Sequence, residues 1–380
     1  MLAQVNTLVQ PLRARAPETE RLRRMHPETL LDLTEAGVFT LTMPTEVGGH
    51  QADEDILVEV LAQIARGCPS TAWIATSILL ANVIPAFMAD KASEEIYATP
   101  NLRITTSFEP TGQAVPVVGG YRVTGQWRWN TGSVHGNWFA AGCMVPGEEN
   151  AGPRMVLIPA GDVKHQNNWR AAGMAGTATN TTAADDVFVP AVRSIAVSDL
   201  TEGRYPARRY SDVPYFNRPF VMLLNTLDAP TPLGMARGAM DCFIDTMATR
   251  GGITYTAWQK AAEAPLLHHQ LATAQYDLEA AEMFMSRLTT LYRVALQRPP
   301  TIMERTQARA YAGHIASLSR SCVNRLFEAS GASQSVLAAD IQRYFRDVNV
   351  LHQHAGIQPT SGDEAYGRVL VGLEPNNQIV

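Results

Sequence analysis

Cysteine, charge and long apolar runs are all scarce in this sequence of 380 residues. Its cysteines lie far apart without a CxxC pair, which predicts reduced thiols in a cytoplasmic protein and not a disulfide framework. They are Cys68, Cys143, Cys242 and Cys322. Charged residues make up 18% of the chain, and the net charge of −5 includes no block of like charges. Without a basic stripe, the chain has no sequence feature of a nucleic-acid-binding protein.

Several motifs that would indicate a function are also missing. No two glycines are two positions apart, so the GxGxxG fingerprint of a Rossmann dinucleotide site is absent. There is no GxxxxGK[ST] phosphate loop, no GxSxG nucleophile elbow and no HExxH zinc motif. Among nine histidines, the close pairs are His268/His269 and His352/His354, and neither has a cysteine or carboxylate that completes a metal set. The sequence therefore predicts no metal site.

The N-terminus shows no charged segment followed by an apolar core, so the sequence indicates no signal peptide. The most apolar stretch runs from Ala72 to Ala89, where Asn82 and Pro85 interrupt it. This pattern predicts a buried core helix rather than a membrane span. We therefore expect that the protein does not bind a membrane.

The sequence divides into three parts that differ in composition and hydrophobic pattern. Residues 1–100 are predicted to be helical, with one helix from Asp53 to about Arg66 and another that begins near Ser70 as N-cap. Residues 101–215 are rich in Gly, Thr and Val and predict a β domain. Its strongest signal is Val117–Tyr121, where two consecutive glycines are expected to supply the positive φ angles that a tight two-residue hairpin turn needs.

Residues 216–380 predict a helical bundle. Apolar residues recur at spacings of three and four in two long segments, which places them on one face of each helix. They are Leu271, Ala274, Leu278, Ala281, Met285 and Leu288, then Ile315, Leu318, Cys322 and Leu326. The Gln297-Arg-Pro-Pro sequence predicts the loop between the two helices. The low charge content also suggests that some surface is buried between subunits.

The order of helical, β and helical parts resembles the acyl-CoA dehydrogenase superfamily. Four segments spread along nearly the whole chain carry the resemblance: residues 33–49 (LTEAGVFTLTMPTEVGG), 125–133 (GQWRWNTGS), 173–190 (GMAGTAT, then DDVFVP) and 346–356 (RDVNVLHQHAG). The resemblance implies an N-terminal α-helical domain, a middle β-barrel-like domain and a C-terminal four-helix bundle.

The fourth segment indicates the subclass. In the dehydrogenases, a similar Arg-Asp stretch leads to a Glu-Gly pair, and that glutamate removes the substrate's α-proton. This sequence has Ala355-Gly356 there, and alanine cannot accept a proton. The departure is similar to the two-component flavin monooxygenases, which often have histidine at the place of His354. The tail, residues 366–375 (YGRVLVGLEP), is similar to hydroxylases of aromatic polyketides and related compounds.

The resemblance implies roles for several residues on the flavin side. Trp129 would pack against the isoalloxazine ring, and the Thr131 hydroxyl would lie beside the flavin N5. Ser107 and Thr179 are further expected flavin contacts. Taken alone, Trp129 and Thr131 are residue types that any strand favours, so the surrounding match carries the assignment.

On the substrate side, the histidines at the end of the fourth segment are the candidate catalytic groups. An imidazole titrates near neutrality, so His354 or His352 could deprotonate a phenol or donate a proton to a peroxide oxygen. Trp73 and His135 are expected to line the substrate pocket. A capping or surface role is the alternative for each histidine.

The leading hypothesis is a monooxygenase that uses a C4a-hydroperoxyflavin, formed from molecular oxygen and reduced FMN or FAD, to hydroxylate an aromatic or polyketide-like small molecule. The resemblance implies a separate flavin reductase as partner and a homo-oligomer, a dimer or a tetramer. One alternative is an acyl-CoA dehydrogenase or oxidase whose base lies elsewhere, for example Glu263 or Glu282. Another is a non-catalytic relative that acts as a binding protein.

Overall fold

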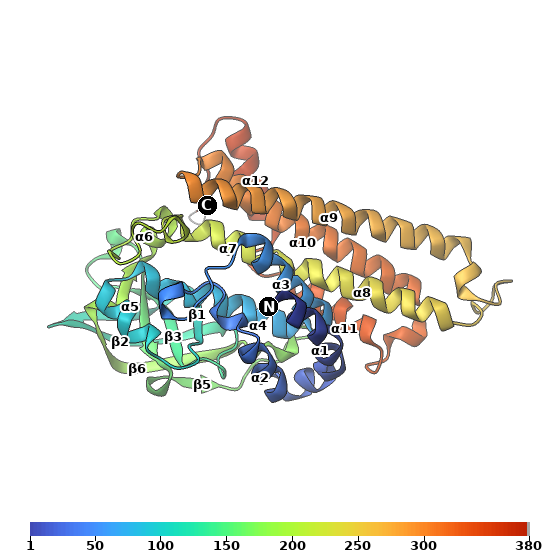
Figure 1. Cartoon of the computed structure of the whole chain (residues 1–380), viewed down its shortest axis with the longest axis horizontal. Helices are drawn as coiled ribbons and strands as arrows, with labels where there is room; N and C mark the ends of the chain where they lie inside the picture. The colour runs from blue at the N-terminus through green and yellow to red at the C-terminus, as the bar shows by residue number, and fades with distance from the viewer. Residues whose placement is uncertain (378–380) are drawn as a thin grey trace.

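The computed structural model describes residues 1–377, in which helices flank a single β-sheet (Figure 1). The N-terminal part is helical, as predicted from the sequence. Its α-helices are α1 (Leu2–Leu22), α2 (Pro27–Glu35), α3 (Glu54–Gly67), α4 (Pro69–Asn82) and α5 (Asp90–Tyr97). The predicted N-cap at Ser70 is wrong by two residues, because Pro69 occupies the first turn and Cys68 is the N-cap.

The middle part forms one seven-stranded sheet in the order β5-β6-β2-β1-β3-β4-β7. β1 and β3 are parallel, and the other neighbouring strands are antiparallel. The strands are β1 (Ile104–Val117), β2 (Gly120–Asn130), β3 (Trp138–Met144), β4 (Arg154–Pro159), β5 (Lys164–Gln166), β6 (Asn180–Pro190) and β7 (Ser194–Ala196). Within residues 1–377, β5 and β7 are edge strands, so hydrogen bonding leaves this sheet open.

The predicted hairpin joins β1 to β2, but its two glycines have different functions. Gly119 has a φ of 83°, the left-handed conformation that a tight turn needs. Gly120 already belongs to β2, where a Cβ atom would overlap the carbonyl oxygen of Val189 on the neighbouring strand. The expectation that both glycines supply a positive φ is therefore wrong for Gly120, which permits close pairing of the strands instead.

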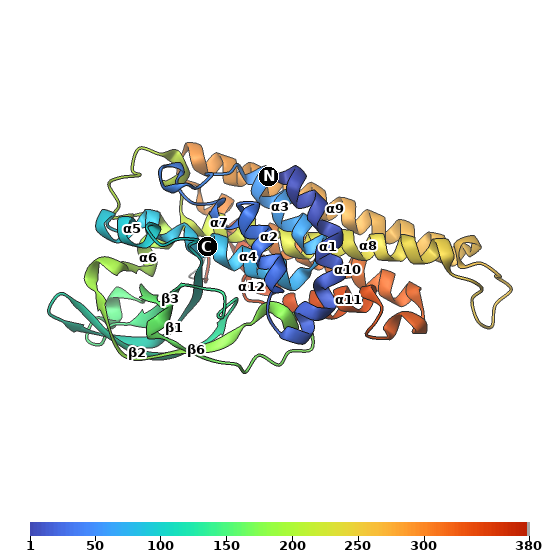
Figure 2. The ribbon, with the colours of Figure 1, turned by 60° about the horizontal axis from the view of Figure 1, so that its bottom comes forward.

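The C-terminal part is a bundle of long helices that projects away from the sheet (Figure 2). α8, α9, α10 and α11 pack against one another, and α3 packs on α8. The predicted apolar face of α9 is buried at five positions, and the predicted loop precedes α10, which a Thr301–Glu304 capping box begins. The helices that follow in sequence are α6 (Val197–Glu202), which packs on β7 and α7 beside the sheet, then α7 (Phe220–Asp228), α8 (Pro230–Thr249), α9 (Pro265–Gln297), α10 (Ile302–Ser330), α11 (Asp340–Leu351) and α12 (Pro359–Leu370).

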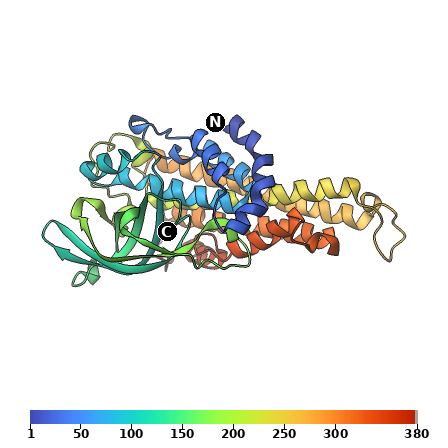
Figure 3. The same cartoon turned by 90° about the horizontal axis from the view of Figure 1, so that it is seen from below.

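Helix α4 lies between the sheet and the bundle (Figure 3). It contacts β1, α7, α8 and α11. Pro69–Phe87 is the one described segment that is long and apolar enough to cross a membrane, and all of its apolar window is buried inside the fold. The prediction of a core helix is thus confirmed. The four cysteines are free and buried, as expected.

Candidate active site

A β-bulge near the end of β2 exposes Trp129. Residues two apart share a face in a regular strand, so Trp129 should point the same way as the fully buried Trp127. The register of β2 against β6 shifts between Trp127 and Asn130, and Trp129 has a φ of 63°. The bulge turns the side chain outward, where it is 59% exposed and meets the Trp169 ring edge-on at 5.8 Å. A left-handed φ is rare for a bulky residue and costs about 1–3 kcal/mol, so the outlier marks a candidate functional position.

Two predicted flavin contacts, Thr131 and Thr179, lie together next to this bulge. Their Oγ1 atoms are 3.1 Å apart, and Thr177 Oγ1 lies 2.7 Å from that of Thr179. The backbone N–H of Gly132 donates to the carbonyl of Thr177, which joins the turn after β2 to the segment before β6. Ser107 donates its hydroxyl to the carbonyl of Arg128, directly before Trp129. Ser107 is therefore bonded to the strand directly before Trp129, and Thr131 and Thr179 meet at the turn directly after it.

The segment before β6 is strained and is held in place by helix α11. Met174 and Ala178 have φ values of 52° and 48°. The buried Asp347 accepts a hydrogen bond of 2.5 Å from the backbone N–H of Met174. A Cβ atom on Gly173 would overlap the carbonyl of Arg346, so only glycine allows this approach. Arg346 and Asp347 are neighbours in sequence, but they form no ion pair with each other within residues 1–377.

Arg346 instead pairs with Glu20 of α1. Burial raises the pKa of Asp347 to about 7 against the opposing effect of the Met174 N–H. The third and fourth segments of the family resemblance thus meet in space, although more than 150 residues separate them in sequence.

Helix α4 connects the bulge region to the predicted catalytic histidine. A Cβ atom on Gly132 would lie 3.1 Å from the Ile74 side chain, so the turn after β2 rests on α4. The neighbouring residue Trp73 is nearly buried, and its ring meets that of His354 edge-on at 4.8 Å. Trp73 and His354, predicted separately from the sequence, are therefore in contact.

The hydrogen bonding of His354 defines its tautomer. The backbone N–H of Gly356 donates to His354 Nδ1 at 3.0 Å, so a neutral ring carries its proton on Nε2. Desolvation by the surrounding protein, with a smaller effect from Arg309, lowers the pKa of His354 to about 4. The residue is nevertheless partly exposed to solvent, so its surroundings do not enclose it completely. At neutral pH the ring can donate from Nε2.

The other two predicted histidines have different surroundings. His352 lies 3.3 Å from the Ser317 hydroxyl of α10, and burial lowers its pKa. His135 accepts a hydrogen bond from the backbone N–H of Met25 through Nε2, and burial lowers its pKa to about 4. These bonds give both residues a structural function, and their catalytic or pocket assignment stays a prediction.

Sequence reasoning missed two polar residues on helix α7. Asn225 and Asp228 are each 1% exposed, although the helix sequence FVMLLNTLD is otherwise largely apolar. Burial raises the pKa of Asp228 to about 7, and Arg309 opposes this effect. Polar residues within an apolar helix were the available signal, but the packing of Asp228 against the turn that carries His354 depends on tertiary structure.

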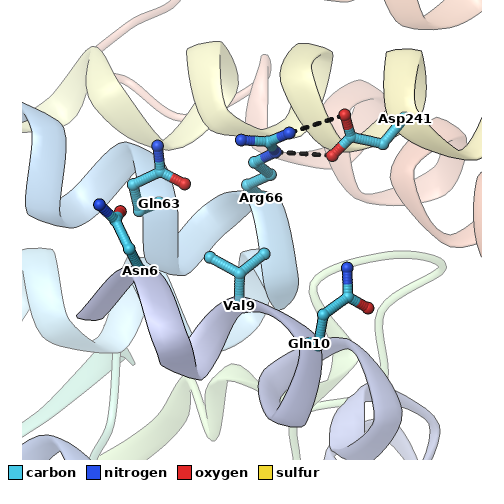
Figure 4. A pocket seen from close by; sticks show the side chains of 6 residues that line it. All are labelled: Asn6, Val9, Gln10, Gln63, Arg66 and Asp241. Carbon is cyan, nitrogen blue, oxygen red and sulfur yellow. Dashed lines mark hydrogen bonds and ion pairs between the residues drawn. The ribbon is translucent and has the colours of Figure 1, made fainter. Parts of the chain in front are cut away.

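A surface hollow of about 300 Å³ between α1, α3 and α8 contains none of these buried polar residues (Figure 4). Its charged members, Arg66 and Asp241, form a two-point ion pair at 2.6 and 2.8 Å. The other lining residues are Asn6, Val9, Gln10 and Gln63. Because its charges neutralise each other and none of the candidate residues lies in it, the hollow is not the candidate active site.

The two carboxylates considered as the catalytic base of a dehydrogenase already form ion pairs. Glu282 pairs with Arg237, and Glu263 pairs with Lys260, and all four side chains are partly or largely exposed. No group of three metal-ligating side chains occurs within residues 1–377.

Comparison with known proteins identifies the family. Residues 3–97 match the model of the acyl-CoA dehydrogenase N-terminal domain, and residues 227–359 match that of its C-terminal domain. The flavin-dependent monooxygenase oxygenase subunit HsaA of Mycobacterium tuberculosis is 31% identical across 100% of this chain and 97% of its own length. The chain belongs to the flavin-dependent monooxygenase branch of the acyl-CoA dehydrogenase family.

Solved structures agree with this assignment of the oxygenase. The 3-HSA hydroxylase from Rhodococcus sp. RHA1 superposes with a TM-score of 0.92, at 29% identity over 100% of this chain and 98% of that one. XiaF from Streptomyces sp., in complex with FADH2 and glycerol, gives 0.90 at 25% identity, over 99% and 96% of the two chains. The predicted acyl-CoA dehydrogenase-like fold and the monooxygenase class are thereby confirmed.

The residues present fit a flavin. A planar ring system needs an exposed flat surface, and the bulge supplies the outward-facing Trp129 ring. It also needs hydrogen-bonding groups near its polar edge, and Thr131 and Thr179 bring two hydroxyls together at the turn that follows Trp129. The structure thus offers both features in one place.

Proposed function

We propose that this oxygenase receives FMNH2 or FADH2 from a separate reductase and hydroxylates an aromatic or polyketide-like small molecule. Reduced flavin and molecular oxygen are the reagents of its class, as the FADH2 complex of XiaF illustrates. The observation that carries the proposal is the bridge formed by α4. It places the exposed Trp129 and the Thr131 hydroxyl on one side and the Trp73–His354 pair on the other.

The flavin, when bound, would supply the activated oxygen. Trp129 would stack on its ring, and the Thr131 hydroxyl would hydrogen-bond to its polar edge. The Thr131–Thr179 contact fixes the position of that hydroxyl before any ligand arrives. Such preorganisation avoids the entropic loss of ordering the group during the reaction.

His354 would donate a hydrogen bond from Nε2 toward the reacting groups. Its Nδ1 is already occupied by the Gly356 N–H, so the ring is oriented and its tautomer is fixed. Because its pKa is lowered to about 4, the imidazole stays neutral at the pH where the enzyme would work. We therefore favour His354 as a hydrogen-bond donor over His354 as a general base, a role that the sequence left open.

Assembly into a homo-oligomer belongs to the same proposal. The outward side of α9 carries large apolar side chains that are more than 60% exposed in the single chain: Leu266, Tyr276 and Met283. Exposed apolar groups along a long helix are typical of a subunit contact. Light scattering after gel filtration should give the mass of a dimer or tetramer, whereas a monomer mass would contradict this part.

A stopped-flow experiment tests the proposed reaction. The protein and reduced FMN or FAD are mixed anaerobically and then exposed to oxygen. A flavin spectrum that differs from both the reduced and the oxidised forms should persist for seconds, and it should decay faster in Thr131→Ala. Immediate return to oxidised flavin, at the rate found without protein, would contradict the proposal.

A further inference from the structure

The peptide group between Ala355 and Gly356 is hydrogen-bonded on both sides. Its N–H, on Gly356, donates to His354 Nδ1 at 3.0 Å. Its carbonyl, on Ala355, accepts from Nη2 of Arg309 in helix α10. The peptide is trans, so the N–H and the carbonyl lie in one plane and point in opposite directions. A single rigid group therefore lies between the guanidinium of Arg309 and the ring of His354.

The position of Arg309 is fixed independently of this peptide. The residue is 4% exposed. A Cβ atom on Gly362 of helix α12 would lie 3.3 Å from Arg309 Cγ, so α12 packs against the aliphatic part of the arginine. The Ser361 hydroxyl, also on α12, is a second and longer acceptor at 3.4 Å from Nη2. The guanidinium is thus held between two helices of the C-terminal part.

The other backbone hydrogen bonds of the turn after α11 do not fix this peptide. Their donors are the N–H groups of His354, Ile357 and Gln358. None of these three bonds involves the Ala355 carbonyl or the Gly356 N–H. A peptide that precedes glycine can turn over at little cost, because glycine accepts both signs of φ. A bond from outside the turn is therefore needed to fix its direction.

Arg309 acts on its surroundings through Nη2. The buried Asp228 of α7 opposes the effect of burial, which lowers the pKa of Arg309. However, Asp228 Oδ2 and Arg309 Nη1 each lack a hydrogen-bond partner within residues 1–377. The hydrogen bonds of Nη2 go to the turn and to α12 instead.

We propose that Arg309 is a positioning residue, which sets the tautomer and the direction of the His354 ring through the peptide between Ala355 and Gly356. While Arg309 holds the carbonyl, the Gly356 N–H points at Nδ1, and the ring proton stays on Nε2. Donation from a cation also polarises the peptide and strengthens the hydrogen bond on its N–H side. This role of Arg309 rests on the proposed function, in which His354 donates from Nε2.

Solid-state NMR of the whole flavin-free chain, with isotope-labelled nitrogen in its histidines, tests the proposal. The two neutral tautomers give different ring-nitrogen spectra, and the signals of His354 are those that disappear in His354→Gln. At pH 8, above the ordinary pKa of histidine, the ring is neutral in every variant. We expect mainly Nε2–H in the wild type. In Arg309→Met, which keeps an apolar stem without a donor, the Nδ1–H form should become at least about fivefold more populated.

Two further variants separate positioning from packing. Ser361→Ala removes the other acceptor of Nη2 and leaves the bond to Ala355, so its His354 spectrum should equal that of the wild type. Arg309→Gln ends two bonds short of the Nη2 position, and it should give the same tautomer mixture as Arg309→Met. It keeps the test open if Arg309→Met does not fold.

If Arg309 only fills the space between α10 and α12, its variants would lose stability but keep the wild-type tautomer. That result in either folded Arg309 variant would overturn the positioning role, and so would Nδ1–H as the main form in the wild type. Absence of the stopped-flow flavin signal in the wild type would overturn the proposed function instead, because the histidine spectra need no flavin.

Discussion

Gly356 shows how one missing methyl group can allow two parts of a chain to pack closely, here the turn after α11 and the Asp228 side chain of α7. In Gly356→Ala, the new Cβ would overlap the Asp228 carboxylate and crowd His354. We expect hydroxylation to fall by at least about tenfold, with a loss of about 1–3 kcal/mol in the free energy of unfolding. Product analysis and urea unfolding would measure these effects. Gly367→Ala, on α12 with open space around it, is the control and should change neither.

Asp228 should make stability depend on pH in an uncommon direction. Its pKa is raised from the ordinary 3.8 to about 7 in the folded chain, so the folded state binds the proton more tightly. Its contribution is therefore neutral below about pH 4, and it destabilises progressively as pH rises to about 7. At pH 8, Asp228→Asn should be more stable than the wild type by up to roughly 4 kcal/mol.

Urea unfolding of both proteins between pH 4 and 8 would measure this difference. Asp347, which has a similarly raised pKa, is present in both proteins and so cancels in the comparison. A difference that does not grow with pH would mean that the carboxyl is solvated or paired in the folded protein.

Individual residues differ in how well the sequence predicts their place. Thr131, Thr179 and His354 sit in segments that resemble a known family, and the structure brings them into two clusters, Thr131 with Thr179 and His354 with Trp73. Asp228 could not be found this way, because its importance depends on burial and on its contact with a distant turn. The hydrogen bond from the backbone N–H of Met25 to His135 could not be predicted from the sequence either.

At the scale of elements, the bulge in β2 exposes the Trp129 ring and lowers the local stability of the strand. In Trp129→Gly, glycine adopts the left-handed φ without strain, which should offset the lost contact with Trp169. We expect the free energy of unfolding to change by less than about 1 kcal/mol. Flavin affinity, measured by fluorescence titration, should nevertheless fall by about tenfold or more.

Trp258, which is 41% exposed in the loop before α9, provides the control. Trp258→Ala should bind flavin like the wild type. Unchanged flavin affinity in Trp129→Gly would contradict the stacking role of Trp129.

Helices and strands were predicted well where the sequence has a clear period. The apolar spacing in α9 and α10 and the glycine turn between β1 and β2 both follow from local physics. The bulge could not be predicted, because it appears only as a register shift between two strands that are distant in sequence. The need for glycine at Gly120 likewise arises from Val189 across the sheet.

At the scale of the whole molecule, the sheet and the bundle meet at Asp347 and the Met174 N–H. In Asp347→Ala, that buried N–H would lose its partner, and the strained segment that leads to Thr179 would loosen. We expect flavin affinity and stability both to decrease, the latter by about 1–3 kcal/mol. Measurements at pH 6, below the raised pKa, avoid the separate effect of removing a charge.

Asp347→Asn is the matched variant, because its amide oxygen can still accept from Met174. It should retain flavin affinity. Equal loss in both variants would contradict the role of this hydrogen bond in joining the two parts.

The central claim is that one site, bordered by the β2 bulge, α4 and the turn after α11, holds both flavin and substrate. A crystal structure of the enzyme with FMN or FAD and 4-nitrophenol would test it most directly. The flavin ring should lie against Trp129 with its polar edge at Thr131, and the phenol should lie beside the Trp73–His354 pair. Flavin bound elsewhere, for example in the hollow lined by Arg66 and Asp241, would contradict the claim.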